Sequence, residues 1–153
     1  MRGGERPSLA GKAQSIGLGA AMLAGLLLSP LRASGEGALA VGATGNVAQD
    51  GMAVGTAVNY KTRRDAVATA MEYCRNFQKA EKSAQNCQLV ATFKRECYAV
   101  AYDPMAGTAG VGWAVGPDPP AAEQRALAAC RISAGKDRAQ FCTIEEMKCD
   151  END

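Results

Sequence analysis

The residues that decide the fold are VGTAV at 54–58 and TRRDAVATAMEYC at 62–74. Both segments recur later in the chain, as VGWAV at 111–115 and DPPAAEQRALAAC at 118–130. The copies are 57 residues apart for the first segment and 56 for the second, so a single one-residue gap aligns them. We therefore expect the chain beyond its amino terminus to be an internal repeat.

Each copy predicts the same series of elements. The segments 52–60 and 110–116 contain β-branched and aromatic residues in partial alternation, which favours strands. The short runs 38–41 and 98–102 precede them across turn residues, and this arrangement predicts a hairpin in each copy.

A helix is expected after each hairpin. Thr62 and Asp118 are residue types that cap helix amino termini, and Pro119 occupies the favoured first helical position. A last strand follows each helix, at 87–93 and at 141–147. Small apolar residues and a cysteine share one face of each helix: Ala66, Val67, Ala70, Met71 and Cys74 in the first copy, and Ala122, Ala126, Leu127 and Cys130 in the second.

The predicted order of elements is therefore β-β-α-β, twice. This order favours an α/β or α+β fold, a single domain at 36–153 in which two β-β-α-β repeats are related by pseudo-twofold symmetry. Because neither half is large enough to bury a good core alone, we expect the two sheets to merge.

The amino terminus has the pattern of a secretory signal peptide, predicted at 1–35. Basic residues come first, an uncharged apolar run follows at 16–28, and small residues stand at 33–35. An apolar run of this length covers only about 20 Å of the roughly 30 Å hydrocarbon core. We expect a soluble periplasmic or secreted protein that has no membrane contact once this segment is removed.

The composition excludes several kinds of chemistry. The chain has no histidine, which rules out a Ser-His-Asp triad, a Cys-His pair and a zinc site that uses histidine. Lys and Arg number 17 against 16 for Asp and Glu, so no strong positive charge indicates nucleic acid as a partner. We expect neither a cofactor nor a metal site.

The six cysteines predict disulfides, because the chain is expected to be exported and the count is even. Connectivity cannot be deduced from sequence alone, but copies that share a fold must pair equivalent cysteines in the same way. The preferred pairs are Cys74–Cys87, Cys130–Cys142 and Cys97–Cys149, and the third is expected to join the copies near their ends. A redox or metal role is disfavoured because no C-x-x-C motif occurs.

Few residues are candidates for a functional site. Tyr60 and Trp113 are a possible binding surface, although aromatic residues are more often part of a core. No residue is predicted to be catalytic. A glycosidase would need two facing carboxylates, and the sequence selects no pair among Asp65, Glu72, Glu96, Asp103 and Glu123. With about 118 residues after the signal peptide, we expect little volume for a deep cleft as well as a core.

Several motifs together resemble a known family. They are ALAV at 38–41, a helix ending in AMEYC at 70–74, CQLVATF at 87–93, CYAVAY at 97–102 and ALAAC at 126–130. This combination is similar to the exported bacterial family catalogued as domain of unknown function 4189. The resemblance implies export, disulfide-type cysteines and a repeated pattern of hairpin, helix and strand. It implies no activity, since the family has no common catalytic residues.

These observations favour an exported, soluble, non-enzymatic protein-interaction module whose partner is an unknown protein outside the cytoplasm. One alternative is an inhibitor or immunity-like protein that blocks another secreted enzyme. The other is a small carboxylate-dependent hydrolase that acts on an extracytoplasmic glycan. The oligomeric state is left open.

The exported protein should begin after residue 33, 34 or 35 and contain no free thiol. Intact-mass analysis before and after reduction measures both properties, because processing removes the amino-terminal segment and each disulfide removes two hydrogens. A protein that retains Met1 in a cytosolic fraction would contradict the prediction.

Overall fold

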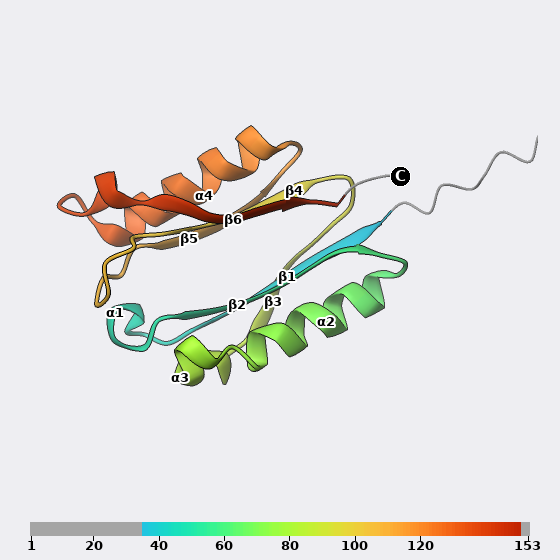
Figure 1. Ribbon diagram of the computed structural model, residues 1–153, viewed down its shortest axis with the longest axis horizontal. Helices are drawn as coiled ribbons and strands as arrows, with labels where there is room; N and C mark the ends of the chain where they lie inside the picture. The colour runs from blue at the N-terminus through green and yellow to red at the C-terminus, as the bar shows by residue number, and fades with distance from the viewer. Residues whose placement is uncertain (1–34, 151–153) are drawn as a thin grey trace, which may run out of the picture. The chain divides into compact units, whose positions relative to one another are not determined.

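The computed structural model describes residues 35–150, and in each half two strands are followed by a long helix and a third strand, with further short helical segments between them (Figure 1). Apart from Gly35, the predicted signal peptide lies outside the described residues. None of the described helices is long and apolar enough to cross a membrane. The elements are β1 (Glu36–Ala43), α1 (Val47–Asp50), β2 (Met52–Tyr60), α2 (Arg63–Arg75), η1 (Gln78–Ala80), α3 (Glu81–Ala84), β3 (Gln88–Phe93), β4 (Cys97–Tyr102), β5 (Val111–Gly116), α4 (Pro119–Ala134), η2 (Ala139–Phe141) and β6 (Thr143–Cys149).

The strands form two separate three-stranded antiparallel sheets, so the expectation of one merged sheet is wrong. The strand orders are β2-β1-β3 and β5-β4-β6. The sheets face each other, with α2 on the outer face of the first and α4 on the outer face of the second (Figure 1). Each sheet is covered on both faces, and the fold is α+β.

Alternation along the central strands explains this layering. In β1, Ala38 and Ala40 pack against α2, while Leu39 packs into the core between the sheets. In β4, the alanines likewise face α4, while Tyr98 and Val100 face the first sheet. Side chains of a strand point alternately to its two faces, so small residues meet the helices and large ones fill the space between the sheets.

Two glycines let the helices lie close to the strands. A Cβ atom on Gly55 would overlap the carbonyl oxygen of Ala70 in α2, and one on Gly112 would overlap the carbonyl oxygen of Ala126 in α4. Any larger residue would push the helix away from its sheet. The VGTAV and VGWAV segments therefore place a glycine where helix and strand are in contact.

The predicted helix starts are confirmed. The Thr62 hydroxyl accepts a hydrogen bond from the Asp65 N–H at 3.1 Å, and the Asp118 carboxylate accepts one from the Ala121 N–H at 2.9 Å. Pro119 begins α4. Each cap satisfies one of the backbone donors that a helix amino terminus leaves without a partner.

Three disulfides join Cys74 to Cys87, Cys130 to Cys142 and Cys97 to Cys149, and none of the described cysteines is free. The first two connect α2 and α4 to the segment just before the next strand. The third does not join the two halves as expected. Cys97 begins β4, and its bond runs to the directly opposite end of β6 inside the second sheet.

The two halves meet at Asp150, a buried residue just after β6. Its carboxylate accepts hydrogen bonds from the N–H groups of Asn59 at 2.9 Å and Arg95 at 3.1 Å. Both residues have positive φ, 63° and 56°, and belong to the first half or its junction with the second. The Asp150 N–H donates to the Glu96 carbonyl at 2.9 Å. One side chain thus holds two unusual backbone conformations in place.

Replacing Asp150 by alanine should destabilise the domain by about 2–4 kcal/mol, because two N–H groups in a partly buried site lose their acceptor. Urea unfolding followed by circular dichroism measures this difference. As a control, Asp137→Ala removes a carboxylate from an exposed residue and should change the free energy of unfolding by no more than about 0.5 kcal/mol. Equal effects from the two substitutions would contradict the prediction.

Candidate functional site

The two aromatic residues proposed from the sequence lie in different layers. Tyr60 packs against the core between the first sheet and α2, whereas Trp113 packs into the core between the two sheets. Both are half-buried. They do not form one surface, and a binding role for either stays a prediction.

The five carboxylates considered from the sequence are also dispersed. Asp65 accepts a hydrogen bond from the Thr62 hydroxyl at 2.8 Å at the start of α2. Glu72 lies on α2, Glu123 on α4 and Glu96 in the turn between β3 and β4. Among these five, Asp103 alone lines the cavity of about 530 Å³ that is described next.

Two adjoining cavities, of about 530 Å³ and about 360 Å³, open between the sheets. Gly51, Met52, Lys79, Tyr102 and Glu145 line both cavities, and we call the combined space the inter-sheet groove. Each volume falls within the range of small-molecule pockets. Both cavities are open to solvent, so the expectation that so small a domain has little volume for a deep cleft stays a prediction.

The walls of the groove come from segments far apart in the chain. The connection between β1 and β2 forms one wall, the loop between β4 and β5 another, and the first half of β6 a third. The inner part has an apolar floor made of Met52, Val54, Phe77, Ala80 and Val100. Lys79, Glu145 and Glu146 stand around this floor, so the groove combines apolar surface with charges of both signs.

Two tyrosines place hydroxyl groups near the glutamates. Tyr98 is fully buried, and its hydroxyl donates a hydrogen bond to a Glu146 carboxylate oxygen at 2.7 Å and lies 3.0 Å from the Thr56 hydroxyl. Burial raises the pKa of Tyr98. Burial and then the charges of Glu145 and Glu146 raise the pKa of Tyr102 to about 12. Both hydroxyls therefore stay protonated near neutral pH.

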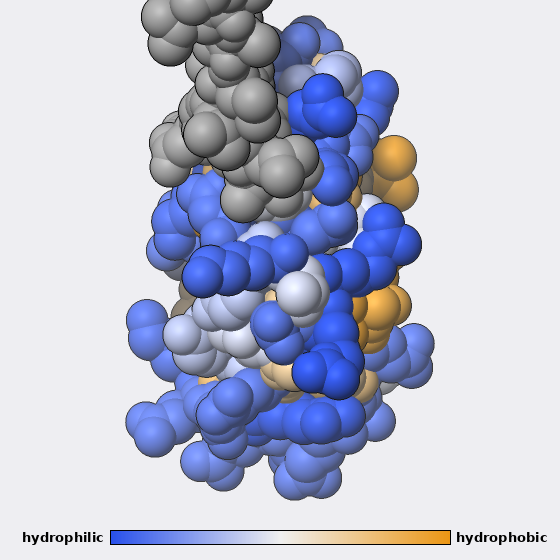
Figure 2. Space-filling view, turned by 90° about the vertical axis from the view of Figure 1, so that its right-hand side faces the viewer, coloured by the Kyte–Doolittle hydropathy of each residue, from blue (hydrophilic) through white to orange (hydrophobic). Residues whose placement is uncertain are grey.

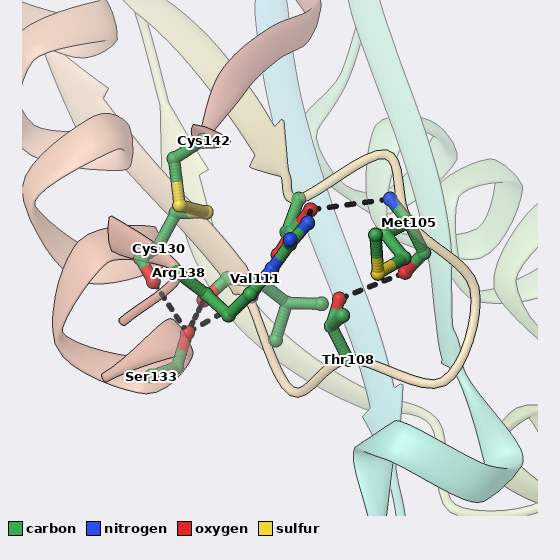
Figure 3. Close-up of a disulfide and its surroundings, with 8 residues drawn as sticks. Met105, Thr108, Val111, Cys130, Ser133, Arg138 and Cys142 are labelled. Carbon is green, nitrogen blue, oxygen red and sulfur yellow. Dashed lines mark hydrogen bonds and ion pairs between the residues drawn. A yellow bond between two sulfur atoms is a disulfide. The ribbon is translucent and has the colours of Figure 1, made fainter. Parts of the chain in front are cut away.

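A partly buried ion pair anchors the loop between β4 and β5. Nε and Nη2 of Arg138 donate to the two carboxylate oxygens of Asp103 at 2.7 and 2.6 Å, and the Met105 N–H donates to the same carboxylate at 3.1 Å. The Arg138 guanidinium also lies 4.2 Å from the centre of the Phe141 ring. Figure 3 shows Arg138 reaching from the region of the Cys130–Cys142 disulfide toward the loop that carries Met105 and Thr108.

Two carboxyl groups of the groove wall have shifted pKa values, and both shifts are downward. The hydrogen bond from Arg138 holds the pKa of Asp103 at about 2. Hydrogen bonds from Lys82, at 3.0 Å, and Thr44, at 2.9 Å, lower the pKa of Asp50. A general acid that works near neutral pH needs the opposite shift. Within residues 35–150 no three His, Cys, Asp or Glu side chains are grouped as a metal site.

Sequence reasoning missed most of this site. Lys79, Tyr102, Arg138 and Glu145 were not candidates for a site, because none of them belongs to a recognisable catalytic or ligand-binding motif. The signal available in the sequence was that polar residues follow the strands where long connections begin. This pattern is common in proteins and does not identify a site unless the fold is known.

A model of the family described as a domain of unknown function, DUF4189, matches residues 37–149. The chain belongs to this family. The DUF4189 match runs from the second residue of β1 to the last residue of β6, so all six strands and all six cysteines fall within it apart from Glu36. It confirms the resemblance inferred from the sequence motifs. No curated protein and no solved structure matches the chain.

Acid should destabilise the wild-type domain more than an Asp103→Asn variant between pH 4 and pH 2. The folded-state pKa of Asp103 is about 2, below its ordinary value of 3.8. The ion pair therefore contributes stability above about pH 4 and loses that contribution as the pH falls through about 2. Thermal midpoints recorded from pH 5 to pH 2 test this, and parallel curves for the two proteins would contradict it.

Proposed function

We propose that this DUF4189 domain is an exported, non-enzymatic protein-interaction module that acts in the periplasm or outside the cell. The inter-sheet groove carries the proposal, since its apolar floor and flanking charges suit a segment of another polypeptide. The hydrogen bonds from Lys82 and Arg138 lower the pKa values of Asp50 and Asp103 on the groove wall. Carboxyl groups that are held in the ionised form suit a structural or binding role.

Two observations support an extracytoplasmic location. The amino-terminal sequence has the pattern of a signal peptide, and disulfides persist mainly in oxidising compartments. The domain carries three of them.

The surface also favours the groove as the place of contact. Seen from the end opposite α1, the described part of the molecule is mostly hydrophilic, with hydrophobic side chains along one margin (Figure 2). The groove lies at the α1 end, where residues from α1 contribute to its wall. Met105, in the adjoining loop, is 55% exposed. Met105 adds exposed apolar surface beside the partly apolar groove.

A second candidate, an inhibitor of another secreted enzyme, is favoured by the loop between β4 and β5. Asp103 accepts from the Met105 N–H, the Thr108 hydroxyl donates to the Met105 carbonyl at 2.9 Å, and the Asp103 N–H donates to the Gly110 carbonyl at 2.8 Å. The loop is therefore held in one conformation while it presents Met105. A preorganised loop binds with a smaller entropic cost.

We also propose that the two halves are copies related by pseudo-twofold symmetry. The support is the shared order of elements, the equivalent strand orders and the disulfide from each long helix to the next strand. In each sheet the pairing between the central strand and the last strand of that half shifts register, opposite Leu39 and Ala40 in β1 and opposite Val100 and Ala101 in β4.

Affinity capture from the extracytoplasmic fraction of the native cell, followed by binding of the purified partner, tests the interaction function. The wild-type domain should form a defined complex, and Glu145→Lys should weaken it at least tenfold because Glu145 lines both cavities. Glu72→Lys makes the same charge change on an exposed residue of α2 and should have no effect.

The hydrolase alternative makes a different prediction for the same proteins. Release of products from purified cell-wall glycan by the wild type, abolished in Glu145→Gln at an unchanged thermal midpoint, would replace the proposed function. Equal weakening of the complex by Glu145→Lys and Glu72→Lys would move the binding site away from the groove.

A further inference from the structure

We propose that the outer edge of β2 takes up an extended, basic segment of the partner protein as an additional strand. The inference rests on the proposed interaction function and specifies where and how the partner binds. It follows from three features: a free backbone edge, a groove beside that edge, and an excess of carboxylates on the facing wall.

The corresponding edge of the second sheet, on β5, is closed by side chains of α4. The Ser133 hydroxyl accepts from the Val111 N–H at 2.9 Å and lies 2.6 Å from the Val111 carbonyl, and the Arg125 guanidinium donates to the Val115 carbonyl at 2.8 Å. Figure 3 shows Ser133 next to Val111. The N–H and C=O groups of successive residues in a strand point alternately to its two sides. In β5 the residues whose N–H and C=O groups point away from β4 are therefore Val111, Trp113 and Val115.

The same geometry identifies the residues of β2 whose N–H and C=O groups point away from β1. In an L-amino-acid strand, the face to which a side chain points fixes the side to which its N–H and C=O point. Gly55 faces α2 in the same way that Gly112 faces α4. β2 lies antiparallel to the central strand β1, and β5 lies antiparallel to the central strand β4 in the equivalent position. Val54 and Thr56, on either side of Gly55, therefore direct their backbone groups away from β1.

Nothing on α2 closes this edge. Arg125 is five residues before Cys130 and Ser133 three residues after it, whereas the same positions around Cys74 are Thr69 and Phe77. Neither donates to β2, and within the described chain the outward N–H and C=O groups of Val54 and Thr56 have no hydrogen-bond partner. Such an edge is a template for pairing with another strand.

The edge borders the inter-sheet groove. Val54 lines the inner cavity together with Met52 and Phe77. Side chains of an added strand alternate in direction, so every second one would point to the groove side of the sheet. The apolar floor offers contact to the aliphatic part of such side chains, as it does for the stems of lysine and arginine.

The charges of the groove favour a basic segment. The facing strand, β6, contributes the Glu145 and Glu146 carboxylates. Among the described residues Glu145 takes part in no ion pair, and Glu146 is 2.9 Å from the Lys148 ammonium group. Lys79 is the basic residue that lines the groove, while Asp50 and Asp103 already have partners in Lys82 and Arg138. On β6, the strand that faces the free edge, two carboxylates therefore stand against the single ammonium group of Lys148, and the Glu145 carboxylate is available to a basic side chain of an added strand.

Two synthetic heptapeptides, acetyl-KVKVKVK-amide and acetyl-EVEVEVE-amide, test the inference with the exported wild-type protein. The basic peptide should bind with a dissociation constant at least tenfold lower than the acidic one, as measured by calorimetry. It should also slow hydrogen exchange at the Val54 and Thr56 amides, because these N–H groups become hydrogen-bonded. Glu145→Lys should reduce its affinity at least tenfold, and Glu72→Lys should leave it unchanged.

Backbone pairing is tested on the peptide side, so that no variant has to fold. A basic peptide N-methylated at alternate residues lacks the donors for pairing and should fail to bind. Equal binding of the methylated and unmethylated peptides, equal binding of the basic and acidic peptides, or unchanged exchange at Val54 and Thr56 would overturn the inference.

Two further outcomes separate this inference from the proposed function. If a captured native partner is not displaced by the basic peptide, the interaction function stands and the β2 edge is not the site. If sedimentation shows a dimer that the basic peptide dissociates, the strand that occupies the edge belongs to a second copy, and the inferred partner segment is wrong.

Discussion

The close contact of each long helix with its own sheet is the constraint on which the other layers depend. α2 and α4 bury only alanine and cysteine against the strands, and a strand glycine meets the helix backbone in each half. The largest fully buried apolar side chains lie on the opposite faces of the sheets, and they are Tyr98, Phe93, Leu39 and Val100. Those faces must be covered, because exposed apolar surface is unfavourable in water. The sheets therefore stack on each other, and the groove lies between them.

The two sides of this stack differ in chemistry. On β5 the residue after the helix-facing glycine is Trp113, which packs into the core between the sheets. On β2 the residue after the corresponding glycine is Thr56, whose hydroxyl lies against that of Tyr98, and Tyr98 in turn holds Glu146. One side is thus filled by an aromatic ring, while the other keeps polar groups and adjoining open volume. The two halves therefore differ in the chemistry of the space beside their edge strands, although their strand orders correspond.

Local features were predictable from the sequence, and distant contacts were not. Thr62 and Asp118 were identifiable as caps because a helix start depends on a few neighbouring residues. One merged sheet was expected because neither half is large enough to bury a good core alone. The structure instead has a helix on one face of each sheet and the other sheet on the opposite face, so each half contributes to two cores. The groove could not be foreseen, since Gly51, Tyr102 and Glu145 meet only after both sheets have formed.

The position of the third disulfide has a consequence for how the protein matures. In the exported protein that we propose, the cysteines would leave the membrane in sequence order, and Cys74 would meet its native partner Cys87 without another free cysteine between them. Cys97 would meet Cys130 before its own partner Cys149, which comes last in the sequence. A bond formed between Cys97 and Cys130 would have to be opened by thiol–disulfide exchange before Cys130 could pair with Cys142. Oxidation of the second sheet, unlike that of the first, would then be helped by disulfide isomerisation.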